Sequence, residues 1–236
     1  KNMLSLINYI LVFSYFFLFS KSTLALQTEW SSGNESQVRI ISPVLNNDKN
    51  EIYLGLEYKL KDGWKTYWKS SGEGGFPQEI IWENSKNIKN LEVLWPTPKY
   101  FEILGFTSIG YIEKVIFPIK IQIQDITKKT LIALSVNYLT CKEICIPGNT
   151  YLELVIPPGD GAYSDQYYNI QKAMSSLPRK INENNYDEIY LSVKALENKK
   201  NISIIVNADS DSLINNPKIF LHSEFGLPVI KPKIKF

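Results

Sequence analysis

The sequence predicts a mainly β protein, in which a β-sandwich is followed by a helical linker and the start of a second β unit. Apolar and polar residues alternate through much of the stretch 37–156, as expected for strands with one buried face. Aromatic residues make up 13% of the chain, and strands favour them together with Ile and Val. Polar and Gly-containing breaks separate the short apolar runs, which is typical of a sandwich.

The first element, over residues 1–25, is predicted to be a signal peptide. Residues 6–19 are almost wholly apolar, which suits the hydrophobic segment of a signal peptide and is short for a membrane span. Thr23 and Ala25 place small residues at the positions that a signal peptidase inspects, so we expect cleavage after Ala25. The alternative is an uncleaved N-terminal anchor. In both cases the body of the protein lies outside the cytoplasm.

The sandwich domain is placed at residues 27–158. Segments with the alternation of short strands cover residues 37–42, 51–60, 115–123, 131–138 and 150–156. Turn-forming residues occur at 61–63 and at 72–75, and prolines mark edges and corners between the segments. The run Pro157-Pro158-Gly159 closes this unit.

The next segment favours a helix. Residues Tyr163–Leu177 have helical composition, with Ser164 as the expected N-cap and Pro178 as the stop. We therefore expect a helical linker over residues 159–186. It would join two β units.

Alternation returns after this linker. Residues 190–196 and 201–206 read as two strands, and the polar stretch 197–200 between them reads as a turn. This pattern predicts a partial second β domain over residues 187–236.

The charge balance argues against a nucleic-acid surface. The chain has 26 basic and 24 acidic side chains, whereas a nucleic-acid surface needs a clustered excess of Lys and Arg. No nucleic-acid partner is expected. The glycines at 72–75 precede no predicted helix, so they do not form a phosphate-binding loop.

The two cysteines of the chain, Cys141 and Cys145, follow a strand-like run that ends at Leu139. A disulfide between them would close a loop of roughly five residues and would add only about 2 kcal/mol to stability. As a structural staple it would be weak, so it can open and close without loss of the fold. Lys142 favours a thiolate and Glu143 opposes it, so the local charges nearly cancel.

Other reactive side chains are scarce. His222 is the single histidine and lies in the second predicted unit, which argues against a Cys-His nucleophile pair. Two cysteines and one distant histidine do not supply the four ligands of a structural zinc site. Copper(I) bound by two thiolates stays open as an alternative, since soft ligands favour it. We expect no resident metal and no cofactor.

Several motifs between Gln37 and Pro158 together resemble one family. They are Leu60-Lys-Asp-Gly-Trp-Lys-Thr-Tyr-Trp-Lys69, Gly74-Gly-Phe-Pro77, Trp95-Pro-Thr-Pro98, Leu104-Gly-Phe106, Gly110-Tyr111 and Cys141-Lys-Glu-Ile-Cys-Ile-Pro147. In combination they resemble the N-terminal periplasmic domain of the DsbD protein-disulfide reductases, in the ScsB-like branch. The resemblance implies an immunoglobulin-like sandwich that acts as a redox domain.

The resemblance also implies a cap over the redox pair. The segment Tyr100–Phe106 matches the cap that shields the cysteines in DsbD members, with Ile103 or a neighbouring aromatic residue such as Phe106 as the shield. Residues expected to line the site, or else to serve as ordinary sandwich core, are Tyr67, Trp68 and Tyr111.

By the same resemblance, Cys141 and Cys145 are the redox pair. Cys145 would form the mixed disulfide with a partner, and Cys141 would resolve it. The implied partners are thioredoxin-like periplasmic proteins and a membrane-embedded reductase module, expected in the same full-length chain. We expect location in the periplasm, with the full-length protein anchored in the inner membrane. The alternatives are a non-redox exported binding module with a structural disulfide and the copper(I)-binding protein.

Overall fold

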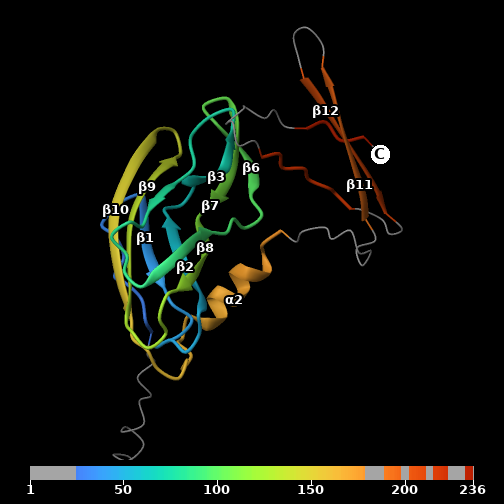
Figure 1. Ribbon diagram of the computed structural model, residues 1–236. Coiled ribbons are helices and arrows are strands. Elements are labelled where there is room, and N and C mark those ends of the chain that lie inside the picture. Colours follow the sequence, from blue (N-terminus) through green and yellow to red (C-terminus); the bar gives the residue numbers. More distant parts are fainter. Residues whose placement is uncertain (1–24, 179–188, 198–201, 211–214, 223–231, 236) are drawn as a thin grey trace, which may run out of the picture.

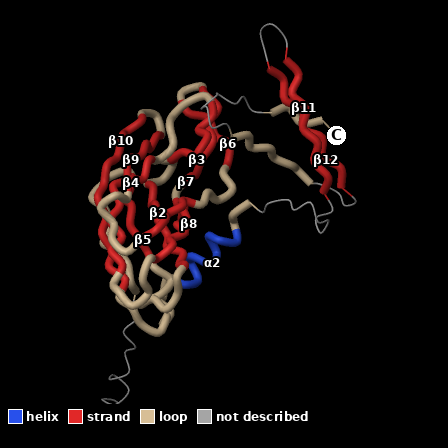
Figure 2. The backbone as a smooth tube through the Cα atoms, in the orientation of Figure 1, coloured by secondary structure: helices blue, strands red, loops and turns tan. Residues whose placement is uncertain are grey.

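A computed structural model of the chain describes residues 25–178, 189–197, 202–210, 215–222 and 232–235. The predicted signal peptide lies almost wholly outside these ranges, as does part of the predicted linker. Figure 2 shows that strands dominate the described chain, with a short helix beside them. Within the described ranges, no helix combines the length and the apolar character that crossing a bilayer requires.

Antiparallel strands form two main sheets and a separate hairpin (Figure 1). The elements are β1 (Ser36–Ile41), β2 (Glu51–Leu60), β3 (Lys65–Gly72), β4 (Glu79–Ile81), β5 (Ile88–Val93), β6 (Lys99–Ile103), β7 (Phe106–Ile112), β8 (Lys114–Ile123), β9 (Thr130–Cys141), β10 (Cys145–Ile156), α2 (Tyr167–Ser175), β11 (Ile189–Glu197) and β12 (Ile202–Ser210). One sheet has the order β1-β2-β8-β5. The other has the order β10-β9-β3-β7-β6, with β4 also paired to β9.

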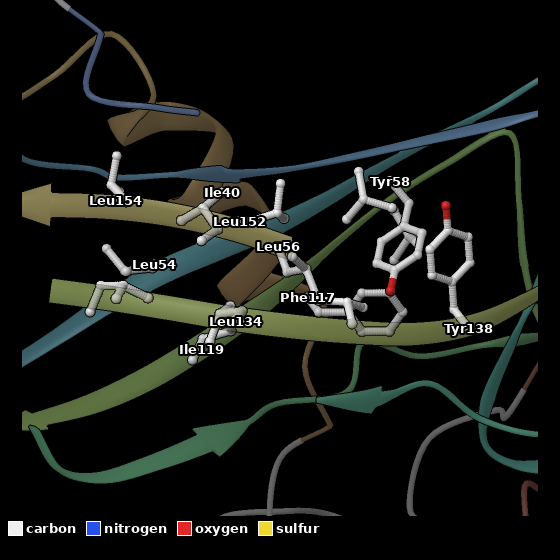
Figure 3. Close-up of a cluster of buried hydrophobic side chains, with 14 of the residues drawn as sticks. Ile40, Leu54, Leu56, Tyr58, Phe117, Ile119, Leu134, Tyr138, Leu152 and Leu154 are labelled. Carbon is white, nitrogen blue, oxygen red and sulfur yellow. The ribbon is translucent and has the colours of Figure 1, made fainter. Parts of the chain in front are cut away.

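The core lies between these two sheets (Figure 3). Tyr58 on β2 meets Phe117 on β8 and Tyr138 on β9 edge-to-face, with ring centroids 5.4 and 5.3 Å apart. Branched aliphatic side chains of both sheets fill the rest of this interface, as their alternation predicts. The mainly β, immunoglobulin-like sandwich that the sequence predicts is confirmed.

Each predicted strand segment falls on a strand of the structure, but the pattern did not indicate β3, β4, β5, β6 or β7. In β3 a register shift between Tyr67 and Gly72 interrupts the alternation. In β5 the exposed side chains of Lys89, Asn90 and Glu92 leave little apolar periodicity to detect. The alternation therefore missed strands with a bulge or a polar surface, and among the missed strands β3 and β7 still supply Trp68, Ile109 and Tyr111 to the main core.

Helix α2 is shorter than the predicted helix, and the expectation that Ser164 is its N-cap is wrong. The N-cap is Gln166, which makes no side-chain capping bond. The Ser164 hydroxyl instead donates to the carbonyl of Ser42 and accepts the N–H of Gln166 at 3.1 Å. Ser164 thus joins the start of the linker to the sandwich, because its hydroxyl has a backbone acceptor there. The helix contacts β2 and β8 and buries Ile170.

The second β unit contains the hairpin β11–β12, in agreement with the predicted return of alternation. The chain beyond it returns to the first sandwich through residues 219–222, which we call the C-terminal strap. The Phe220 ring stacks on Tyr100 of β6 at 4.9 Å and meets Trp68 of β3 edge-on at 6.1 Å. The Tyr100 hydroxyl donates to the carbonyl of Ile219 at 2.5 Å. The strap therefore packs against the main core near the β6 edge.

We expect Phe220→Ala to lower the free energy of unfolding by about 1–2 kcal/mol, because a partly buried ring would leave the core. Urea unfolding followed by tryptophan fluorescence measures this change. Lys218→Ala, a change at the exposed residue directly before the strap, is the control and should have little effect. Equal stability of Phe220→Ala and the unaltered chain would contradict the packing of the strap.

Candidate functional site

Cys141 and Cys145 form a disulfide across the end of the β9–β10 hairpin. Cys141 is the last residue of β9 and Cys145 the first of β10, and the two are paired in register. The Lys142 N–H also donates to the carbonyl of Ile144 at 3.0 Å. The disulfide thus joins residues that the strand pairing already holds together, so its opening leaves the long hairpin in place.

The two cysteines have different surroundings. Cys141 is fully buried, whereas Cys145 is exposed. Cys141 belongs to a small apolar group, the cysteine cluster, which is separate from the main core. The members of the cysteine cluster are Tyr67, Phe101, Ile103, Leu139 and Cys141. Of the two cysteines, Cys145 is therefore the one exposed to solvent, while the side chains of the cluster cover Cys141.

Tyr67 on β3 reaches both sulfurs. Its hydroxyl donates to Cys141 Sγ at 3.0 Å and lies 3.9 Å from Cys145 Sγ. The ring packs against Gly75, where an added Cβ would lie 2.1 Å from the ring, and against Phe101 at 6.0 Å between centroids. Burial raises the pKa of Tyr67, so its hydroxyl keeps its proton and remains a donor.

The β6–β7 turn covers one side of the cysteine cluster. Leu104 and Gly105 form its two-residue loop with φ of 54° and 83°, and Ile103 pairs with Phe106 across it. Positive φ at both loop positions matches the twist of the flanking strands. Ile103 is buried in the cysteine cluster, while Leu104 and Phe106 are exposed. The predicted cap segment therefore comprises most of the edge strand β6, the turn after it and the first residue of β7.

Four exposed apolar side chains lie in or directly beside the loops that adjoin this cluster. We call them the apolar rim, and they are Phe76, Leu104, Phe106 and Ile144. Ile144 precedes Cys145, and Phe76 follows Gly75, which packs on the Tyr67 ring. Large exposed apolar side chains gathered at one place are a mark of interaction surfaces.

The other residues expected at the site lie elsewhere. Trp68 and Tyr111 are buried in the main core rather than in the cysteine cluster, and the Tyr111 hydroxyl donates to the carbonyl of Pro96 at 2.7 Å. Neighbouring residues of a strand face opposite sides of the sheet, which separates Trp68 from Tyr67. His222 lies with its Nδ1 2.9 Å from Ser70 Oγ, in contact with the first sandwich.

Two lysines near the cysteine pair make contacts at the β2–β3 turn. The Lys142 side chain packs on Gly63 in the β2–β3 turn, where a Cβ added to Gly63 would lie 3.0 Å from Lys142 Cε. Lys65 is paired in register with Cys141. Its ammonium donates to the Gly63 carbonyl at 3.0 Å and lies 5.9 Å from the centre of the Phe101 ring of the cysteine cluster. Tyr67 is therefore the donor that meets Cys141 directly. Among the described residues, no group of three or more His, Cys, Asp or Glu side chains is placed to hold a metal ion.

Comparison with known proteins gives a family match and similar folds. Residues 36–157 match the family described as thiol:disulfide interchange protein DsbD, N-terminal. No curated protein matches the sequence. The crystal structure of the N-terminal periplasmic domain of ScsB from Proteus mirabilis has a TM-score of 0.56 and 22% identity, covering 80% of this chain and 87% of that chain. This likeness shows a shared fold.

A second solved structure is the reduced N-terminal domain of DsbD from Neisseria meningitidis. It has a TM-score of 0.30 and 12% identity, and the match covers 54% of this chain and 88% of that chain. At this similarity we draw no argument from it.

Proposed function

The chain belongs to the family of N-terminal domains of the thiol:disulfide interchange protein DsbD, and on this premise we propose that its Cys141–Cys145 pair relays electrons to soluble periplasmic thiol proteins. The electrons would come from a membrane-embedded or thioredoxin-like reductase module. Family membership and the bonded cysteine pair together support thiol:disulfide interchange as the general activity.

The observation that carries the proposal is the unequal burial of the two cysteines. An exchange site needs one sulfur that a partner can attack and a second that can resolve the mixed disulfide. Cys145 is exposed and Cys141 is fully buried, which fits these two roles. A structural staple needs neither an open sulfur nor an apolar rim beside it.

The proposed exchange proceeds in two steps. A thiolate of a reduced donor attacks Cys145 Sγ, so that a bond forms between the two proteins while the Cys141–Cys145 bond breaks. Cys141 leaves as a thiolate with the electron pair of the broken bond. The donor's second thiolate then attacks the donor's sulfur in the mixed disulfide and releases Cys145. The donor becomes a disulfide, and the pair gains two electrons and two protons. The reverse sequence, begun by the Cys145 thiolate, reduces an acceptor.

We propose that thioredoxin-like proteins dock on the apolar rim. A partner that covers Phe106 and Ile144 while its thiolate reaches Cys145 would remove exposed apolar surface from water. The β6–β7 turn would act as the cap, with Ile103 over Cys141 and Phe106 at its outer side. Trp68 and Tyr111 would support the sheet from its other face.

We propose that this function is carried out in the periplasm. The support for this location is that the chain belongs to the DsbD N-terminal family and shares the fold of the N-terminal periplasmic domain of ScsB. In this proposal residues 1–25 are an export signal and residues 27–158 are the redox domain. The helical linker over 159–186 would connect it to a second β domain, and the membrane-embedded reductase module would belong to the same full-length protein.

Redox titration tests the proposed function. The oxidised chain is equilibrated with glutathione buffers and with a reduced thioredoxin, and free thiols are counted by alkylation and mass. We expect complete two-electron reduction by thioredoxin and a potential above about −300 mV, the region below which structural disulfides lie. A lower potential together with no reduction by thioredoxin would indicate a structural disulfide instead.

A further inference from the structure

We propose that Tyr67 is a catalytic residue of this exchange, because its hydroxyl donates a hydrogen bond to the sulfur of Cys141 as that sulfur leaves. The inference rests on the proposed function and adds a specific group to it. The hydroxyl already lies 3.0 Å from Cys141 Sγ in the disulfide form. It is the side chain of the cysteine cluster that brings a polar hydrogen to the buried sulfur.

The buried position of Cys141 makes such a donor necessary. A thiolate released there has no exposed surface through which water could solvate it. Burial of a charge without a hydrogen-bonding partner is costly, and it raises the pKa of a thiol. The hydrogen bond that the Lys65 ammonium makes is to the Gly63 carbonyl, with the Phe101 ring 5.9 Å away, and the Lys142 side chain packs on the same β2–β3 turn. A hydrogen bond from Tyr67 to the thiolate offsets the cost.

The fold holds the Tyr67 hydroxyl in place. Antiparallel pairing of β3 with β9 sets Lys65 opposite Cys141, and Tyr67, two residues further along β3, lies on the same face of the sheet as Cys141. Gly75 has φ of +82° and leaves room for the Tyr67 ring, while Phe101 contacts another part of the ring. A donor fixed before the reaction needs no reorganisation when the charge develops.

The distances also make the disulfide asymmetric. The Tyr67 hydroxyl is 3.0 Å from Cys141 Sγ and 3.9 Å from Cys145 Sγ. Attack on Cys145 releases the sulfur that has the closer donor, and a better-stabilised thiolate leaves faster. In this step the attacking thiolate bonds to Cys145 Sγ, the S–S bond breaks, and its electron pair stays on Cys141. Tyr67 keeps its proton throughout. Burial and Tyr67 thus direct attack to the same sulfur.

Tyr67→Phe removes the hydroxyl and keeps the ring. We expect the second-order rate of reduction by dithiothreitol and by reduced thioredoxin to fall about tenfold, equivalent to about 1.4 kcal/mol. In the Cys145→Ala background, the pKa of Cys141, followed by thiolate absorbance at 240 nm, should rise by about one unit. The matched control is Tyr58→Phe, which removes a buried hydroxyl without a partner from the main core. This control should change neither quantity.

Unchanged rates and an unchanged Cys141 pKa in Tyr67→Phe would overturn the role of Tyr67. Failure of the unaltered chain to exchange with thioredoxin would instead overturn the proposed function, so the two failures differ. If Tyr67→Phe does not fold, 3-fluorotyrosine at position 67 gives a stronger donor of similar size. It should lower the Cys141 pKa in the Cys145→Ala background, and no change there would also overturn the proposal.

Discussion

Cys145→Ala should reduce thiol exchange with thioredoxin to the rate of a blank reaction. The sulfur that we propose a partner attacks is then absent, and the remaining Cys141 is fully buried within the cysteine cluster. The fold should persist, because the disulfide closes a loop of about five residues and its loss costs only about 2 kcal/mol. Exchange is measured by the oxidation of reduced thioredoxin, and the fold by circular dichroism.

Cys141→Ala is the matched control, because it breaks the same disulfide and keeps the exposed sulfur. We expect this variant to accumulate a stable mixed disulfide with a single-cysteine thioredoxin that carries 5-thio-2-nitrobenzoate on its exposed sulfur. The Cys145 thiolate bonds to the thioredoxin sulfur, thionitrobenzoate leaves with the electron pair of the broken bond, and neither protein keeps a second thiol that could resolve the new disulfide. Cys145→Ala should trap none under the same conditions. Equal trapping by the two variants, seen as a covalent adduct by mass, would contradict the assignment of Cys145 as the partner-facing sulfur.

The position of the cysteine pair was predictable from local sequence. The alternation through residues 131–138 identifies β9, and the close spacing of Cys141 and Cys145 suggests a short turn after it. Strand pairing then sets the two cysteines opposite each other. Their unequal burial was not predictable by this means, because it depends on side chains of β3 and β6 that lie far away in the sequence.

The contact between Tyr67 and Cys141 shows this limit. The two residues are 74 positions apart, and their meeting depends on the pairing of β3 with β9. The family motif drew attention to Tyr67 and Trp68 together but could not separate them. Strand alternation separates them once β3 is recognised, because Tyr67 faces the cysteine cluster and Trp68 faces the main core.

The contacts of the C-terminal strap with the first sandwich were also not predictable from the sequence. Phe220 looks like any apolar residue in the second β unit, yet its ring stacks on Tyr100 of the first. His222 is distant from the cysteines along the chain, but its ring lies against Trp68, next to Tyr67 in β3. No local pattern encodes such a return of the chain, because the contacts depend on the path between the two units.

Phe117→Ala should cause the largest loss of stability among these substitutions, about 3–5 kcal/mol. Phe117 is fully buried, and its ring meets Tyr58, Trp95 and Tyr111 at centroid distances of 5.4, 5.3 and 5.0 Å. Removal of the ring loses the free energy gained by transferring it from water to the core. It also leaves a cavity that the three neighbouring rings cannot easily close. Urea unfolding followed by circular dichroism measures the loss.

Phe117→Leu and Phe76→Ala are the controls for this prediction. Leu refills much of the cavity, so Phe117→Leu should cost clearly less than Phe117→Ala. Phe76 is 51% exposed, so Phe76→Ala should leave stability nearly unchanged. Phe117 lies in the main core and not in the cysteine cluster, so the folded fraction of Phe117→Ala should still exchange disulfides at the normal rate. A slower rate in the folded fraction would show that the core and the redox site are coupled, whereas a normal rate would assign the reactivity of Cys145 to its local surroundings.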